Sequence, residues 1–134
     1  MAILSIIVRQ VLDVVKKYII EAILGGADGL LFALIIFMAV EYLTQILVAI
    51  RNRKKSDEIG FAGVAKKLSI FFLVAMGNVI DGLIMQSGSM IRMAVILFYL
   101  YFEGGIIMNN VSILGLPIPQ KLKDILEQFK DGKK

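Results

Sequence analysis

The chain contains no cysteine and no histidine among its 134 residues. Without cysteine it forms no disulfide and carries out no thiol chemistry, and without histidine it lacks the side chain that most often transfers protons near neutral pH. The usual zinc sites, which are built from these two residue types, are excluded as well. The sequence also has no nucleotide-binding glycine loop that ends in lysine and serine or threonine. We therefore predict no catalytic, cofactor-binding or metal-binding residues.

Charged residues are scarce, at 19% of the chain, whereas hydrophobic residues make up 58% and the mean hydropathy is +0.82. A water-soluble domain of this length has too much surface for its volume to bury so many apolar side chains. Lipid is the solvent that suits this composition. Lys and Arg number 15 against 11 Asp and Glu. In a membrane protein we expect this excess to mark the cytoplasmic side, and we predict no nucleic-acid partner.

Three long apolar segments, 29–50, 68–85 and 91–108, are predicted to cross the membrane. The first has 22 residues, which is the helix length needed for a hydrocarbon core about 30 Å thick. Its Leu, Ile, Val and Phe residues favour insertion by roughly 4–8 kcal/mol, which exceeds the cost of about 3 kcal/mol for one central acidic residue. The second and third segments are joined by so short a link that they must form an antiparallel hairpin.

The segment 3–24 is predicted to form an amphipathic helix, because its polar residues fall within an arc of roughly 160° at the helical period. The charged residues of this arc are Arg9, Asp13, Lys16, Lys17 and Glu21. We favour a helix that lies in the membrane interface. The alternative is a helix that crosses the membrane in an oligomer and turns its polar face toward water. Gly25, Gly26 and Gly29 are predicted to form a hinge after this helix.

A short amphipathic helix is predicted over 120–130, in the C-terminal tail. Its apolar residues follow the spacing of one helix face, and they are Leu122, Ile125, Leu126 and Phe129. Pro117 and Pro119 separate this helix from the third span, because each lacks a backbone N–H and disfavours helical geometry in the residue before it. Gly132 suits the end of the helix.

The distribution of basic residues predicts the orientation in the membrane. Six Lys and Arg residues lie in the loop 51–67 and five in the tail, against three in the segment 3–24 and one in the second hairpin. Three spans place the loop and the tail on the same side, so eleven basic residues face one side and four face the other. We therefore predict that the loop and the tail are cytoplasmic. This count leaves open whether the N-terminal helix crosses the membrane.

Each span carries one acidic residue, and other polar residues share its helix face. These candidate intramembrane or pore-lining residues are Glu41, Thr44 and Gln45, then Asn78 and Asp81, then Arg92, Tyr99, Glu103 and Asn110. The four in the third span lie within about 40° of one another around the helix. A lone carboxylate in lipid costs several kcal/mol, so we expect these groups to face other helices or water. The sequence is consistent both with hydrogen bonds between helices and with a water path.

These segments together predict an all-α integral membrane protein that forms a single membrane domain over residues 1–134. It has an N-terminal amphipathic helix, three transmembrane helices and a short C-terminal amphipathic cytoplasmic helix. We expect a multi-pass membrane protein.

Several short motifs follow one another from the predicted hinge to the tail. A Gly-Gly pair and an aspartate precede the first span, which contains an acid-aromatic-x-Thr element. A Gly-x-x-Gly element follows in the basic loop, and a Leu-Gly-x-Pro-x-Pro turn leads into the basic amphipathic tail helix. The residues of these motifs outside the spans are Gly25, Gly26, Asp28, Gly60, Gly63, Gly115, Pro117 and Pro119. In this combination the chain resembles the phage lysis and toxin-secretion holin family of Gram-positive bacteria and their phages.

The resemblance implies a holin, which accumulates in the cytoplasmic membrane and then oligomerises into lesions that release a cell-wall hydrolase or export a toxin. The implied partners are the lipid bilayer, further copies of the chain, and an endolysin or secreted toxin that is not stably bound. A small ion or solute channel, or a transporter subunit with a fixed narrow pore, is the main alternative. A third possibility is a non-conducting scaffold whose tail helix recruits a partner.

Overall fold

The computed structural model describes residues 1–26, 28–53, 59–85 and 88–130, and no strand occurs in these ranges. The elements in chain order are α1 (Ala2–Leu24), α2 (Gly29–Asn52), α3 (Phe61–Val79), the π-helix η1 (Ile80–Met85), α4 (Met90–Ile113) and α5 (Gln120–Lys130). Three stretches, α2, α3 with most of η1, and α4, are long and apolar enough to cross a membrane. The predicted all-helical fold with three spans is confirmed.

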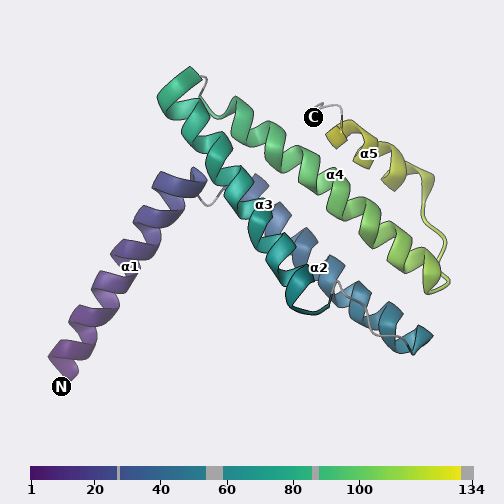
Figure 1. The fold of residues 1–134 in the computed structure, drawn as a ribbon, viewed down its shortest axis with the longest axis horizontal. Coiled ribbons are helices and arrows are strands. Elements are labelled where there is room, and N and C mark those ends of the chain that lie inside the picture. Colours follow the sequence, from purple (N-terminus) through teal and green to yellow (C-terminus); the bar gives the residue numbers. More distant parts are fainter. Residues whose placement is uncertain (27, 54–58, 86–87, 131–134) are drawn as a thin grey trace.

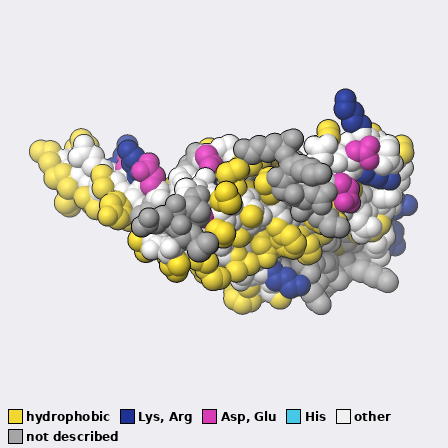
Figure 2. All heavy atoms as spheres, turned by 90° about the horizontal axis from the view of Figure 1, so that it is seen from above, with side chains coloured by type: hydrophobic (Ala, Val, Ile, Leu, Met, Phe, Trp, Pro, Cys, Tyr) yellow, Lys and Arg dark blue, Asp and Glu magenta, His cyan; other side chains and the backbone are white. Residues whose placement is uncertain are grey.

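The helix α4 lies at the centre of the bundle, because it packs against α2, α3 and α5. The tail helix α5 folds back along α4, whereas α1 contacts α3 near the hinge and otherwise leaves the bundle (Figure 1). Nearly the whole of α1 is exposed along its length. In Figure 2 it projects at the left with hydrophobic side chains along one edge and charged ones along the other. Apart from the contact of its C-terminal end with α3, the amphipathic faces of α1 therefore lie exposed among the residues that the structure describes.

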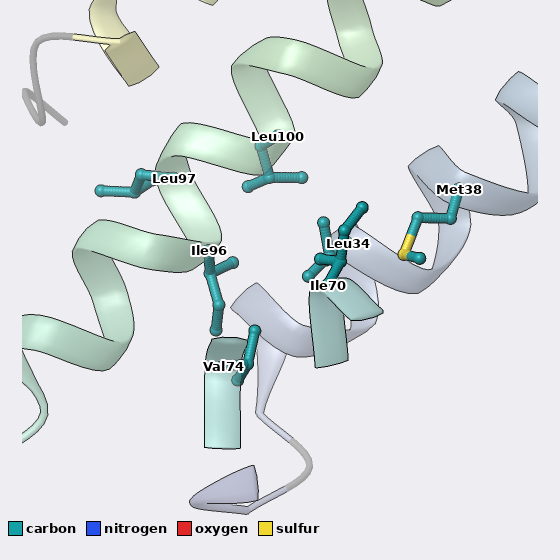
Figure 3. Close-up of a cluster of buried hydrophobic side chains, with 7 residues drawn as sticks. All are labelled: Leu34, Met38, Ile70, Val74, Ile96, Leu97 and Leu100. Atoms are coloured by element: carbon teal, nitrogen blue, oxygen red, sulfur yellow. The ribbon is translucent and has the colours of Figure 1, made fainter. Parts of the chain in front are cut away.

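The core consists of aliphatic side chains and one methionine contributed by the three spans (Figure 3). They are Leu34 and Met38 from α2, Ile70 and Val74 from α3, and Ile96, Leu97 and Leu100 from α4. Only 22–33% of each span is buried within the protein. Because so much of each apolar helix faces outward, the surface around the bundle suits contact with lipid.

All three spans are longer than the sequence predicts, α2 by two residues at its end and α3 and α4 by more. The helix α3 begins at Phe61, seven residues before the predicted boundary, so that Lys66 and Lys67 belong to the helix and not to the loop. The helix α4 continues to Ile113, five residues past the predicted boundary. Both extensions are stabilised by polar contacts between helices, since Lys67 pairs with Glu41 of α2 and the extension of α4 contacts α2 through an amide side chain. The hydropathy of a segment does not depend on such contacts, so it does not predict these extensions.

The tail helix α5 has the predicted bounds, and Leu126 is the residue of its predicted apolar stripe that is buried among those the structure describes. Leu126 is 5% exposed, whereas Leu122 and Ile125 remain 48% and 41% exposed. The side chain of Phe129 and the whole of Gly132 lie outside the described residues. The described part of the stripe is thus only partly buried, although α5 lies along α4 (Figure 1).

Candidate functional site

The polar side chains predicted within the spans fall into two clusters in different parts of the bundle. The hinge cluster, where α1 meets α2 and α3 meets α4, comprises Gly25, Asp28, Asn78, Asp81 and Arg92. The carboxylate cluster, near the other end of the spans, comprises Glu41, Thr44, Lys67, Glu103 and Asn110. The polar face predicted along α4 is therefore divided, since Arg92 belongs to one cluster and Glu103 and Asn110 to the other.

Arg92 is the centre of the hinge cluster, and its side chain is 2% exposed. Its Nη1 donates to Asp28 Oδ2 at 2.8 Å, and its Nη2 donates to the carbonyl oxygen of Gly26 at 2.9 Å. Its Nε donates to the carbonyl oxygen of Leu24. The guanidinium thus satisfies carbonyl groups at the C-terminal end of α1, where the helix dipole also favours a cation.

Gly25 makes the approach of Arg92 possible. Its backbone φ is +82°, in the left-handed region that ends α1. A Cβ atom at this position would lie 2.5 Å from Arg92 Nε and 2.7 Å from Asn78 Oδ1. Any other residue would therefore combine backbone strain with a steric clash. The predicted glycine hinge is thus tightly packed at Gly25, whereas Cβ atoms at Gly26 and Gly29 would meet nothing within 4 Å, and Gly29 is the first residue of α2.

The second carboxylate of the hinge cluster, Asp81, joins the two arms of the hairpin. It lies in η1, and its oxygens accept hydrogen bonds from the backbone N–H groups of Ile91 at 2.8 Å and Arg92 at 2.7 Å. These N–H groups belong to the first turn of α4, where an acidic side chain is favoured. Asn78 donates to the carbonyl oxygen of Ile23 at 3.1 Å and so connects α3 to α1.

Asp28 is the N-cap of α2, and its Oδ1 accepts a hydrogen bond from the backbone N–H of Leu31 at 3.0 Å. The hydrogen bonds donated by Arg92 hold the pKa of Asp28 below its ordinary value, against the opposing effect of partial burial. Because a depressed pKa keeps the carboxylate charged, its bonds to Arg92 contribute stability at neutral pH. That contribution is lost only as the pH falls through the lowered pKa.

The carboxylate cluster joins all three spans. Glu41 on α2 is 1% exposed and forms an ion pair with Lys67 on α3, which is 15% exposed. Asn110 Nδ2 on α4 donates to Thr44 Oγ1 on α2 at 2.9 Å. The Thr44 hydroxyl in turn donates to the carbonyl oxygen of Glu41 at 2.8 Å. A buried carboxylate needs such a partner, because removing one member of the pair leaves an uncompensated charge.

A cavity of 510 Å³ opens beside the carboxylate cluster. Its polar lining comprises Glu41, Gln45, Lys66, Lys67, Ser69, Tyr99, Glu103, Asn109 and Asn110. The structure therefore brings together most of the polar residues predicted in the first and third spans, including the half-buried Gln45 and Tyr99. Asn78 and Asp81 of the second span lie elsewhere, in the hinge cluster. In the part of the chain that the structure describes, no group of acidic side chains is arranged to hold a metal ion.

The polar face of α1 joins neither cluster. Its charged residues, which are Arg9, Asp13, Lys16, Lys17 and Glu21, are all exposed. Of the motif residues outside the spans, Gly60 is the N-cap of α3 and Gly63 is buried. Gly115 has a φ of +101° and, with Pro117 and Pro119, forms the connection from α4 to α5.

Two partners in these clusters are not identified by the sequence reasoning. The sequence predicts Lys67 in a basic loop, and no local signal connects it with Glu41, 26 positions earlier. The sequence singles out Asp28 only as a motif residue. Its place directly before an apolar helix is typical of an N-cap, and this signal could have predicted its role at the start of α2. The partner of Asp28, Arg92, could not be deduced in that way because it lies 64 residues away.

Comparison with known proteins gives matches along most of the chain. An uncharacterized 14.9 kDa protein in the nagH 3' region of Clostridium perfringens is 32% identical over 83% of this chain and 84% of its own length. An uncharacterized protein of Bacillus subtilis, YtkC, is 35% identical over 80% of this chain and 79% of its own length. No solved structure matches the chain. Residues 18–131 match the bacteriophage holin family, and this protein therefore belongs to that family.

Proposed function

We propose that copies of this holin-family protein assemble in the bacterial cytoplasmic membrane into water-filled lesions that release a cell-wall hydrolase or export a toxin. Membership of the holin family and the three apolar spans support this proposal. The observation that carries it is the contrast between two sets of charged residues. Those of the spans have partners inside one copy, whereas those of α1 are exposed along a helix that leaves the bundle.

This contrast suggests which residues meet water in the assembled state. Glu41 and Lys67 neutralise each other between the helices, so a dispersed copy is stable in lipid. The charged face of α1 is exposed in the part of the chain that the structure describes, and the membrane interface satisfies it while copies are dispersed. In an assembly, the same face lines the common aqueous space. The polar residues of the spans are a second candidate lining, available if the helices rotate on assembly.

If copies assemble, lesions are expected to open only above a threshold density of copies in the membrane. With inducible expression in bacteria, we expect a lag followed by sudden loss of membrane potential and escape of a cytoplasmic enzyme. The lag shortens at higher expression, because self-association depends on the density of copies in the membrane. Addition of a depolarising agent also shortens it, since the membrane field contributes about 2.3 kcal/mol per charge per 100 mV. Growth, membrane potential and enzyme activity in the medium are measured together.

The 510 Å³ cavity beside the carboxylate cluster favours one alternative, a fixed narrow channel for ions or small solutes within a single copy. The two functions differ in the size of what crosses the membrane. Leakage of small ions that rises in proportion to expression from the first minutes, with the enzyme retained, would contradict the lesion and support the channel.

We further propose that the connection between α2 and α3, which the sequence predicts as the basic loop 51–67, and the tail face the cytoplasm. In Figure 2 most Lys and Arg side chains gather at the end of the molecule where α2 ends and α5 begins. Retention of Lys and Arg on the cytoplasmic side then orients the bundle with the hinge cluster outside. Residues 54–58 of the loop and 131–134 of the tail lie outside the described residues.

The orientation is tested with single cysteines, which the natural chain lacks. Asn52→Cys and Lys121→Cys are expected to resist a membrane-impermeant thiol reagent in intact cells before lysis begins. Ser89→Cys, in the link between α3 and α4, is the matched control and is expected to react. The reverse labelling pattern would invert the proposed topology.

A further inference from the structure

The helices α3 and α4 are in contact near the hairpin and diverge toward the other end of the spans (Figure 1). Near the hairpin, a Cβ atom at Gly77 would lie 3.2 Å from the backbone Cα of Arg92, so the two helices approach closely there. Toward the other end, the cavity of 510 Å³ lies between them, and Glu41 and Gln45 of α2 also line it. The two helices thus form a wedge-shaped groove, which we call the α3–α4 groove.

A second cavity, of 360 Å³, continues the α3–α4 groove toward the hairpin. Leu73 and Tyr99 line both cavities, so the two lie directly beside each other. Three aromatic side chains of α4 form one wall, since the ring centroid of Tyr99 lies 5.0 Å from that of Phe98 and 6.2 Å from that of Phe102. Phe98 lines the second cavity and Phe102 lines the first. The groove is therefore continuous along this wall.

The chemical character of the lining changes along the α3–α4 groove. Near the hairpin the lining is apolar apart from Tyr99, whereas the wide end carries two acidic and two basic residues. A polar end followed by an apolar one is the order of headgroup and acyl chain within one leaflet. Between Tyr99 and Ile91 the helix α4 rises by about 12 Å. This length is close to half of a hydrocarbon core about 30 Å thick, so the groove has the polarity and length of one phospholipid.

The charges at the wide end of the groove are of both signs and balance. Glu41 and Lys67 neutralise each other as an ion pair. The other two charged residues of the lining are Glu103, which is 2% exposed, and Lys66, which is exposed at the rim. An anionic headgroup would suit the lysine but not the buried carboxylate, and a purely cationic one would suit the carboxylate but not the lysine. A headgroup with one phosphate and one ammonium complements both.

We propose that the α3–α4 groove binds one phospholipid whose zwitterionic headgroup carries a primary ammonium, as in phosphatidylethanolamine. Its phosphate accepts hydrogen bonds from Lys66, its ammonium donates to Glu103, and one acyl chain lies along the aromatic wall toward the hairpin. Phosphatidylglycerol lacks the ammonium, and phosphatidylcholine lacks its N–H donors. The site is complete within a single copy, so it does not depend on the proposed lesions. A bound lipid also fills the cavity and keeps water out of it.

The chain has no tryptophan, so a Phe98→Trp variant places one fluorescent reporter in the groove. This protein is inserted in phosphatidylcholine vesicles that contain rising fractions of phosphatidylethanolamine or phosphatidylglycerol with brominated acyl chains, which quench tryptophan on contact. Half-maximal quenching is expected at an about fivefold lower fraction of phosphatidylethanolamine than of phosphatidylglycerol. Ile35→Trp is the control, because Ile35 is exposed on α2 and lines neither cavity of the groove. It is expected to be quenched equally by both lipids.

Three further changes are made in the Phe98→Trp protein. Ala94→Phe fills the apolar part of the groove and is expected to abolish the lipid preference. Ala39→Phe is its matched control, since Ala39 is also exposed but lines neither cavity, and it is expected to keep the preference. Glu103→Gln removes the acceptor of the ammonium and leaves Lys66, so the preference is expected to reverse toward phosphatidylglycerol. A misfolded variant would not produce such a reversal.

Three results would overturn the lipid site. The first is equal quenching by the two lipids, or stronger quenching by phosphatidylglycerol, in the Phe98→Trp protein. The second is a preference for phosphatidylethanolamine that survives Ala94→Phe, because the acyl chain would then lie elsewhere. The third is the same preference persisting in Glu103→Gln, because the ammonium would then have another partner.

Discussion

Replacing Arg92 with methionine is expected to destabilise the folded protein by about 2–4 kcal/mol. Methionine retains much of the apolar stem but removes the donors to the carbonyl groups of Leu24 and Gly26 and leaves Asp28 without its cation. The loss is measured by titrating the protein in micelles with a denaturing detergent and following helix content by circular dichroism. We also expect the end of α1 to loosen, so that a cysteine at the half-buried position Ile20 reacts faster with a thiol reagent.

Arg51→Met is the matched control for this change. Arg51 also donates to a carbonyl oxygen at the end of a helix, that of Ile113 at 2.6 Å, but this bond is exposed. An exposed interaction of a charged side chain contributes less than about 1 kcal/mol, so this variant should be nearly as stable as the parent. Equal losses for the two variants would mean that the buried guanidinium does not anchor the hinge cluster.

Replacing three charged residues of α1 with leucine is expected to reduce enzyme release by at least about tenfold while the protein stays in the membrane. The residues are Asp13, Lys16 and Lys17. They are exposed in the folded protein, so the change removes no internal contact of the bundle. If α1 lines the lesion, its wall becomes apolar and water is excluded from it. Release of a cytoplasmic enzyme and the amount of protein in the membrane are compared at equal expression.

In the control for this variant, three exposed valines on the apolar face of the same helix are replaced with leucine. They are Val11, Val14 and Val15. It preserves the charged face, and we expect timing and release close to those of the parent. Unchanged release in the charged-to-leucine variant would make α1 an interfacial anchor only. The lining would then have to come from the faces that carry Glu41, Asp81 and Glu103, which would require these side chains to leave their positions between the helices.

Much of the architecture is determined by the sequence itself. Span lengths follow from runs of apolar residues that match the bilayer, and the amphipathic character of α1 and α5 follows from the helical period. The proline-containing connection ends α4 because proline cannot continue a helix. These features are local, since each depends on residues within a few turns of one another. That is why the three spans and both flanking helices could be predicted without any knowledge of how they pack.

The tertiary structure alone decided which groups meet. Helical periodicity places Glu41 on a face of its own helix, but it does not indicate that Lys67 lies opposite. In the same way, the burial of Leu126 on Gly104 depends on how α5 folds back along α4. The position of Arg92 depends on Gly25, 67 residues earlier, which leaves space for its side chain. Such pairings depend on the rotation and depth of separate helices, which packing and polar contacts across the bundle determine together.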